Sequence, residues 1–175
     1  MNKFLVSFIC VIFSCLVSAQ SLDKTYGNKF FTMNYPSNWE ILQEDSRVTS
    51  NINISVQVIE KRVNEWDFCP SVNIIKSPQK RTETTASLAA ITLKQIRSVL
   101  PQVESLGSKS VRLSGCNGTM LEYKGSYNGY SLHWLQYIIK KSDNTTYTIT
   151  CTLDNNKFQS QKKIAEAIVN SIVIK

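Results

Sequence analysis

The alternation of hydrophobic and polar residues along the chain predicts a protein built largely from short strands. The clearest run is residues 52–58, in which isoleucine and valine occupy every second position, as in a half-buried strand. Shorter apolar runs bounded by turn-forming residues predict further strands. These runs cover residues 30–35, 39–42, 72–76, 109–113, 119–123, 132–139 and 146–153.

Two segments change to the period of a helix. In residues 85–100 the apolar residues Leu88, Ile91, Ile96 and Val99 share one helical face, and Pro101 ends the segment. A second helix is expected near the C-terminus, where Asp and Asn residues at 154–156 can act as N-caps. Its apolar face holds Phe158, Ile164, Ala165, Ile168 and Ile172.

The last three long strands are expected to form a meander. Asn128-Gly129 is a strong hairpin signal and places Tyr127 opposite Tyr130. In the next hairpin we expect Lys141 opposite Thr146. In that register one face is polar and the other is a core face covered by a helix. The expected core face holds Leu121, Tyr123, Leu132, Trp134, Ile138, Tyr147, Ile149, Cys151 and Leu153. The expected polar face holds Glu122, Lys124, His133, Thr148, Thr150 and Thr152, with Leu135, Tyr137 and Ile139 as apolar exceptions.

The first 19 residues differ from the rest of the chain. Lys3 precedes an apolar run over residues 4–17, and small residues follow at the end of that run. This is the arrangement of a secretory signal peptide, and we expect cleavage between Ala19 and Gln20. The protein is therefore predicted to be exported, either secreted or periplasmic.

Two alternatives to a cleaved signal peptide remain open. A transmembrane anchor needs about 20 predominantly apolar residues, whereas this run is shorter and is interrupted by Ser7 and Ser14. A lipid anchor at Cys15 is the other alternative, because a loose lipobox precedes that residue. We expect the mature chain, residues 20–175, to be a single domain without a transmembrane segment.

Composition and charge exclude one class of partner. The chain has 175 residues and a formal net charge of +7 at pH 7, but its cations are scattered. The densest patch, residues 76–81, holds three cations, and no aromatic platform accompanies it. We therefore do not expect the protein to bind nucleic acid.

The expected mature chain keeps three cysteines. Cys151 lies on the expected core face, and Cys116 is two strands away, nearer 20 Å than the roughly 6 Å that a disulfide tolerates. Cys69 and Cys116, both in expected loops, remain as a candidate disulfide.

Little in the sequence points to catalysis. His133 is the only histidine, and the register places it in the middle of a strand opposite Lys124, where no loop delivers a nucleophile. No phosphate loop, metal-binding motif or nucleophile elbow occurs, so we assign no catalytic residue, metal or cofactor. Trp66 and Phe68 lie in a polar loop, where they either form an exposed patch for a partner or pack under the sheet edge.

The order of these elements resembles the PsbP-like superfamily, which includes PsbP and DcrB-type domains. The residues that carry the resemblance are the Tyr35-Pro36-Ser37-Asn38-Trp39 entry and the Ile168-Val169-Asn170-Ser171-Ile172 exit. The resemblance implies an α+β fold, an α/β/α sandwich around an antiparallel sheet with one central and one C-terminal helix. It also implies a binding module rather than an enzyme, and it transfers no catalytic residue to this chain.

Three functions follow from these expectations. The first is an exported, non-enzymatic binding module that contacts a protein or envelope partner through its loops and the more polar sheet face. The second is a carrier that holds a small apolar ligand between the sheet and a helix. The third is a hydrolase that uses His133 or a pair of carboxylates.

Overall fold

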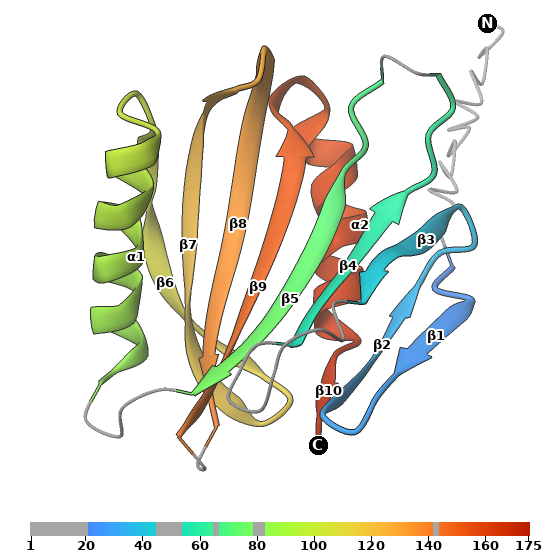
Figure 1. Ribbon diagram of the computed structural model, residues 1–175, viewed down its shortest axis with the longest axis horizontal. Coiled ribbons are helices and arrows are strands. Elements are labelled where there is room, and N and C mark those ends of the chain that lie inside the picture. Colours follow the sequence, from blue (N-terminus) through green and yellow to red (C-terminus); the bar gives the residue numbers. More distant parts are fainter. Residues whose placement is uncertain (1–20, 45–53, 65–66, 79–82, 142–143) are drawn as a thin grey trace, which may run out of the picture.

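The computed structural model in Figure 1 describes residues 21–44, 54–64, 67–78, 83–141 and 144–175. Within these ranges the chain forms two α-helices that lie on either side of an antiparallel sheet. The fold is therefore a mixed α+β fold, as the sequence predicts. The elements in chain order are β1 (Lys24–Gly27), β2 (Phe31–Tyr35), β3 (Trp39–Glu44), β4 (Ile54–Glu60), β5 (Ser71–Pro78), α1 (Thr85–Val99), β6 (Glu104–Leu113), β7 (Cys116–Tyr127), β8 (Tyr130–Lys140), β9 (Thr145–Asp154), the 3₁₀ turn η1 (Asn155–Lys157), α2 (Phe158–Asn170) and β10 (Val173–Ile174).

Two sheets organise the described residues. The larger is a seven-stranded antiparallel sheet in the order β3-β4-β5-β9-β8-β7-β6. The smaller sheet, β1-β2-β10, joins the two ends of the described chain. Every strand expected from the sequence is present, whereas β1 and β10 were not expected. Both are short, and their sequences carry no alternation long enough to predict them.

Local sequence explains where the helices begin. Thr84 and Ser87 form a capping box at the start of α1, in which each side chain bonds the backbone N–H of the other. Asp154 also acts as a cap, but its carboxylate accepts from the N–H of Asn156 and begins the 3₁₀ turn η1. Helix α2 therefore starts later, at Phe158.

The strand register confirms one of the two expected hairpins. Tyr127 pairs with Tyr130 as expected, which places Tyr123 opposite Trp134. In the second hairpin, however, Lys140 rather than Lys141 pairs with Thr146, so the expected register is wrong by one residue. Because side chains alternate between the two faces of a sheet, this shift moves every side chain of β9 to the opposite face from the one expected.

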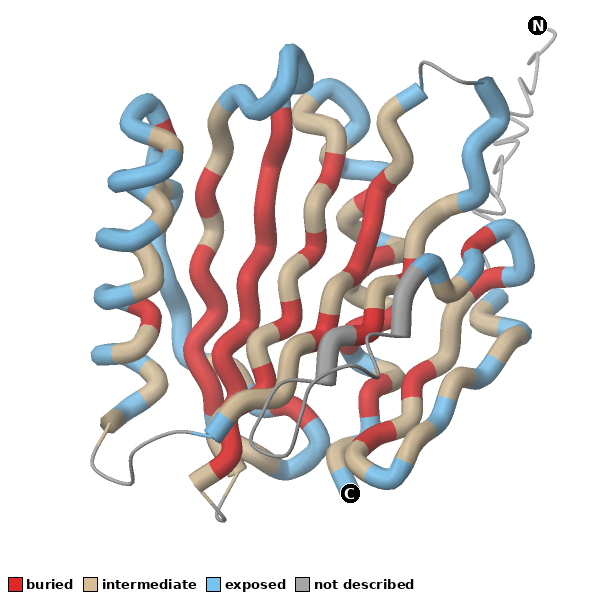
Figure 2. The backbone as a smooth tube through the Cα atoms, in the orientation of Figure 1, coloured by how far each residue is buried: buried red, intermediate tan, exposed pale blue. Residues whose placement is uncertain are grey.

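The corrected register gives the sheet an apolar core on each face rather than on one. Figure 2 shows β8 buried along most of its length, which is typical of a strand that is covered on both sides. One face, the α2 face, has a core that includes Leu135, Tyr137, Ile139, Tyr147, Ile149, Cys151 and Leu153. The other, the α1 face, has a smaller core of Ala89, Val103, Leu121, Tyr123, Leu132, Trp134 and Ile138.

Helix α1 covers only part of its face. It contacts β7 and β8, while the neighbouring strands β9, β5 and β4 present a row of polar side chains on the same face. This row continues from Gln136 of β8 through Thr150 of β9 and Asn73 of β5 to Gln57 of β4. Thr150, Asn73 and Gln57 are all partly exposed. The edge of α1 thus forms a boundary between a covered and an open half of the sheet.

Candidate functional site

A groove lies between α1 and the α1 face of the sheet, and we call it the α1 groove. It consists of two adjoining pockets that share Thr92 and Gln95. The first, the aromatic end, has a volume of about 420 Å³ and is also lined by Ile96, Val99, Leu100, Tyr123, Tyr127 and Trp134. The second, the polar end, has a volume of about 260 Å³ and is also lined by Ser77, Glu83, Leu88, Ile91, Ile138, Thr146 and Thr148.

The apolar stripe of α1 forms one wall of the α1 groove. Its residues, Leu88, Ile91, Ile96 and Val99, are spaced by three, five and three positions, which places them on one side of the helix. In this helix only Ala89 is buried, whereas Ile91 and Val99 are 48% and 74% exposed. The stripe expected from the sequence is therefore present, but much of it borders the groove instead of filling a core.

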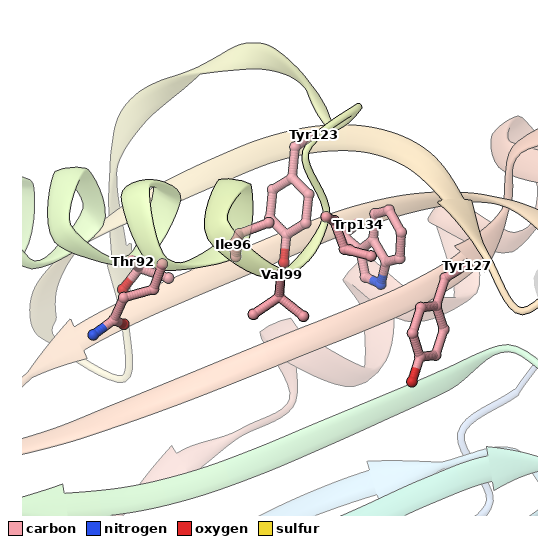
Figure 3. A pocket seen from close by; sticks show the side chains of 8 residues that line it. Thr92, Ile96, Val99, Tyr123, Tyr127 and Trp134 are labelled. Atoms are coloured by element: carbon pink, nitrogen blue, oxygen red, sulfur yellow. The ribbon is translucent and has the colours of Figure 1, made fainter.

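Two stacked aromatic rings form the floor of the aromatic end. Tyr123 and Trp134 face each other across β7 and β8, with ring centroids 5.2 Å apart. The Tyr123 hydroxyl donates to the side-chain oxygen of Gln136 at 3.2 Å, and burial raises the pKa of Tyr123, which keeps the hydroxyl protonated. Figure 3 shows Ile96 and Val99 of α1 beside these two residues.

Further aromatic residues lie where the β7–β8 hairpin meets the aromatic end. Tyr127 and Tyr130 are 50% and 41% exposed, and the Phe68 ring lies 5.4 Å from that of Tyr130. Phe68 is half-buried and also contacts the core of the α1 face. It therefore combines both expectations for this loop, since it packs at the sheet end and still borders solvent. Its expected companion Trp66 lies outside the described residues.

The polar end contains two buried oxygen atoms that need hydrogen-bond partners. Within the described residues, neither Oε2 of Glu83 nor Oγ1 of Thr146 has a partner, and Thr146 is only 3% exposed. The Nζ of Lys140 donates to the backbone carbonyl of Glu83 and so brings a positive charge to the same end. Buried polar atoms are nearly always satisfied in proteins, so this pair distinguishes the polar end from an ordinary surface hollow.

The sequence did not single out Glu83 or Thr146. The register error placed the polar residues of β9 on the same face as His133, away from the helix that borders them. The pairing of the two aromatic residues in the floor could be predicted from the sequence, because the Asn128-Gly129 turn places Tyr123 opposite Trp134.

His133 lies on the opposite face, beneath the start of α2. As expected, it pairs with Lys124 across the strands, but it is only 5% exposed, whereas the sequence suggested a more open position. Its Nε2 is 2.9 Å from Oε1 of Glu122, and its ring stacks on Phe158 with centroids 3.5 Å apart. The extra cover comes from the η1–α2 segment, whose position the strand register alone does not give. These contacts hold the imidazole as part of the packing between β8 and α2.

The expected Cys69–Cys116 disulfide is absent, and Cys69, Cys116 and Cys151 are free thiols. Cys69 precedes β5 near the Tyr130 end of the sheet, whereas Cys116 begins β7 at the opposite end. About nine residue positions separate them along the strand direction, or on the order of 30 Å, which is far beyond disulfide reach. Burial raises the pKa of the Cys151 thiol, which keeps it a small apolar core residue.

Other sequence expectations concern features of the whole chain. The expected cleavage site at Ala19 and Gln20, and the alternative lipid anchor at Cys15, lie outside the described residues. Among the residues that the structure describes, no helix is long and apolar enough to span a membrane. Within the same residues, no group of three or more His, Cys, Asp or Glu side chains is arranged to hold a metal ion.

Comparison with known proteins identifies the family. The model of the PsbP-like protein family matches residues 15–174, so the chain belongs to this family, as its entry and exit motifs predict. No curated protein sequence matches the chain.

Solved structures share the fold at low sequence identity. The solution structure of cyanobacterial PsbP from Synechocystis sp. PCC 6803 is 15% identical, with a TM-score of 0.62 over 87% of this chain and 92% of that one. A Pseudomonas aeruginosa protein of unknown function, described as a putative regulator, is 13% identical, with a TM-score of 0.60 over 87% and 96% of the two chains. LpqN, which is involved in cell envelope biogenesis of Mycobacterium tuberculosis, is 14% identical, with a TM-score of 0.60 over 87% and 91%.

Proposed function

We propose that the protein is an exported, non-enzymatic binding module that holds an apolar group in the α1 groove of an α/β/α sandwich. One observation carries the proposal: the stacked Tyr123 and Trp134 rings form the floor of an open space of about 420 Å³ beside α1. Concave, mostly apolar sites of about 300–1,000 Å³ with a few polar groups are typical of small-molecule binding. The relation to LpqN supports an envelope setting without assigning its role to this chain.

Burial of apolar surface supplies the affinity in this proposal. Each methylene group that a ligand moves from water to the aromatic end contributes about 0.8 kcal/mol. The exposed side chain of Val99 is covered in the same event, so the protein gains buried surface as well. A ligand with a chain or ring system is therefore favoured over a small polar metabolite.

The surroundings of the titratable groups support binding rather than catalysis. His133 is held between Glu122 and the Phe158 ring, on the face opposite the α1 groove. Burial raises the pKa of Tyr123, so its hydroxyl does not supply a base near neutral pH. If His133→Ala abolished a detected hydrolase activity while the protein remained folded, a hydrolase would be the better function for this protein.

The experiment uses the neutral fluorescent probe N-phenyl-1-naphthylamine with the mature protein. We expect saturable binding that Val99→Asp weakens at least tenfold, because a carboxylate at the mouth of the aromatic end opposes apolar contact. Val63→Asp is the matched control, since Val63 is 87% exposed and lies outside the α1 groove. Equal binding by wild type and Val99→Asp would overturn the proposal. Native mass spectrometry of protein from its own source should also show a retained small mass.

A protein or envelope partner is the second candidate, favoured by the exposed aromatic residues at the sheet end. Tyr127 and Tyr130 are accessible on the β7–β8 hairpin, and Phe68 adjoins them. Aromatic residues of this kind often anchor protein interfaces. A pull-down from the native envelope or culture fluid should recover a partner that the Tyr127→Ala/Tyr130→Ala variant fails to retain. Recovery of the same proteins by both forms would contradict this candidate.

A further inference from the structure

We propose that the α1 groove recognises a single-chain amphiphile with an uncharged, hydroxyl-bearing head group. The head group binds Glu83 and Thr146 at the polar end, and the chain lies over Tyr123 and Trp134 at the aromatic end. This inference rests on the proposed function, which makes the groove the binding site, and it adds the chemical class of the ligand.

The unsatisfied oxygens define what the head group must offer. A buried carboxylate oxygen accepts hydrogen bonds, so Oε2 of Glu83 needs a donor. The hydroxyl of Thr146 can donate and accept, so it matches a ligand hydroxyl, which does the same. Leaving both atoms unpaired lowers the stability of the protein, and a ligand that satisfies them gains that energy on binding.

Charge at the polar end favours an uncharged head. The carboxylate of Glu83 is accompanied by the Nζ of Lys140, which is held on the Glu83 backbone carbonyl. A charged head group would meet one group of opposite charge and one of the same charge at this end. The attraction and the repulsion would largely cancel, so neither an anionic nor a cationic head group is favoured. A hydroxyl satisfies the two oxygens without adding a buried charge.

The length of the groove fits a chain of intermediate size. Leu88 lines the polar end and Val99 lines the aromatic end, and at about 1.5 Å per helical residue they are about 16 Å apart along α1. Thr92 and Gln95 line both pockets, so the two ends form one path along the helix. An extended decyl chain with its head group covers most of this path.

An extended peptide fits the same path less well. The floor is formed by β7, β8 and β9, whose backbone groups are paired with neighbouring strands in the middle of the sheet. A peptide amide at the aromatic end would face Ile96, Val99 and the two aromatic rings, which offer apolar surface. Burying amides without partners is unfavourable, whereas an alkyl chain carries no such groups.

The test compares 1-decanol with 1-methoxydecane, which has a similar chain and an oxygen but no donor. Both are titrated against the bound N-phenyl-1-naphthylamine probe, using the mature protein. We expect 1-decanol to bind roughly five- to tenfold more tightly, because only its hydroxyl donates to Glu83. Equal affinity of the two compounds for the wild-type protein would overturn the inference.

Three variants assign the preference to the polar end. Glu83→Met and Thr146→Val should each reduce the preference for 1-decanol at least threefold, whereas Glu83→Gln should retain it because an amide oxygen still accepts. Thr146→Val should also leave the melting temperature of the free protein unchanged or raise it, since the hydroxyl it removes has no partner among the described residues. A merely structural role for Thr146 predicts the opposite, a lower melting temperature with the ligand preference intact.

These outcomes separate the two proposals. If both compounds bind in the groove with equal affinity, and Val99→Asp weakens both, the head-group inference is wrong and the proposed function stands. If neither compound displaces the probe and Val99→Asp has no effect on the probe, the proposed function fails as well.

Discussion

The two helices lie on opposite faces of the same sheet and are held very differently. Helix α2 buries Gln161, Ala165, Ile168 and Val169, and its face gains further cover from the small sheet through residues such as Phe31. Helix α1 buries only Ala89 and leaves much of its apolar stripe beside a groove. The face closed by α2 therefore serves as the main core, while the face under α1 keeps an open groove.

The cover on the α1 face is limited by the elements available. The chain has no second sheet on that side among the described residues, and α1 packs mainly against β7 and β8. At its N-terminal end the helix is fixed by the Thr85 hydroxyl, which shares a hydrogen bond of 2.9 Å with that of Thr119. Its C-terminal half, which borders the aromatic end, depends on the partly buried Ile96 and Leu100.

The largest expected effect comes from shortening one residue in each helix. Ile168→Ala should lower the free energy of unfolding by about 2–5 kcal/mol, because Ile168 is fully buried in the α2 face and leaves a cavity. Ile96→Ala should lower it by only about 1 kcal/mol, because Ile96 is partly exposed at the groove. Urea unfolding measures both. If both variants lost the same free energy of unfolding, the two faces would be packed alike, and the contrast between the helices would be wrong.

A pair of glycines tests the same contrast on the sheet itself. A Cβ at Gly118, on the α2 face, would lie 2.7 Å from the Ile138 carbonyl oxygen and closer still to the Ile139 side chain. Gly118→Ala should therefore cost about 1–3 kcal/mol of stability. Gly125→Ala, on the α1 face, should be nearly neutral, because its nearest neighbour would be 3.5 Å away, at Val103. Thermal unfolding that ranks the two variants in the reverse order would refute the difference in packing.

A smaller effect is expected from the cap of α1. Thr84→Ala removes the side chain that accepts from the Ser87 N–H and should cost about 1 kcal/mol. We expect hydrogen exchange to speed up in the amides of α1 and to stay unchanged in those of α2. If exchange rose equally in both helices, α1 would be part of the same cooperative unit as the main core.

The smallest effect concerns pH and the α2 side of the molecule. Burial raises the pKa of Glu60 above 4.5, and the nearby Lys157 charge and the Asn38 hydrogen bond oppose this rise only in part. Because the folded state holds the proton more tightly, this group favours folding below pH 4.5, and that contribution is lost as the pH rises through the raised pKa. Glu60→Gln should therefore raise the melting temperature slightly at pH 7 and leave it unchanged at pH 4. A lower melting temperature for the variant at pH 7 would reverse the assigned sign.

Sequence patterns predicted the elements better than their relative placement. Alternation found the long strands, and the Asn128-Gly129 turn gave the β7–β8 register, because a two-residue turn fixes which residues pair. The β8–β9 register was wrong because its turn is longer, and neither turn residues nor apolar content distinguished Lys140 from Lys141 as the partner of Thr146. Once β8 is apolar on both sides, alternation no longer tells which face belongs to which helix.

For the candidate site, too, the sequence predicted the separate parts but not how they come together. The stripe of α1 and the Tyr123–Trp134 pair could be predicted separately, but their meeting depends on which face α1 covers. Glu83 and Thr146 are far apart in the chain, and only the fold brings their oxygens to one pocket. The Cys69–Cys116 pairing failed for a related reason, since loop residues at opposite ends of a sheet look equivalent in sequence.

The most direct test of the α1 groove is a map of backbone amide shifts on addition of 1-decanol to the isotope-labelled protein. We predict shifts in α1 and around Tyr123, Trp134 and Thr146, with residues of α2 such as Ile168 unaffected. Shifts centred on α2 and the core of its face, with none along the α1 groove, would contradict the account.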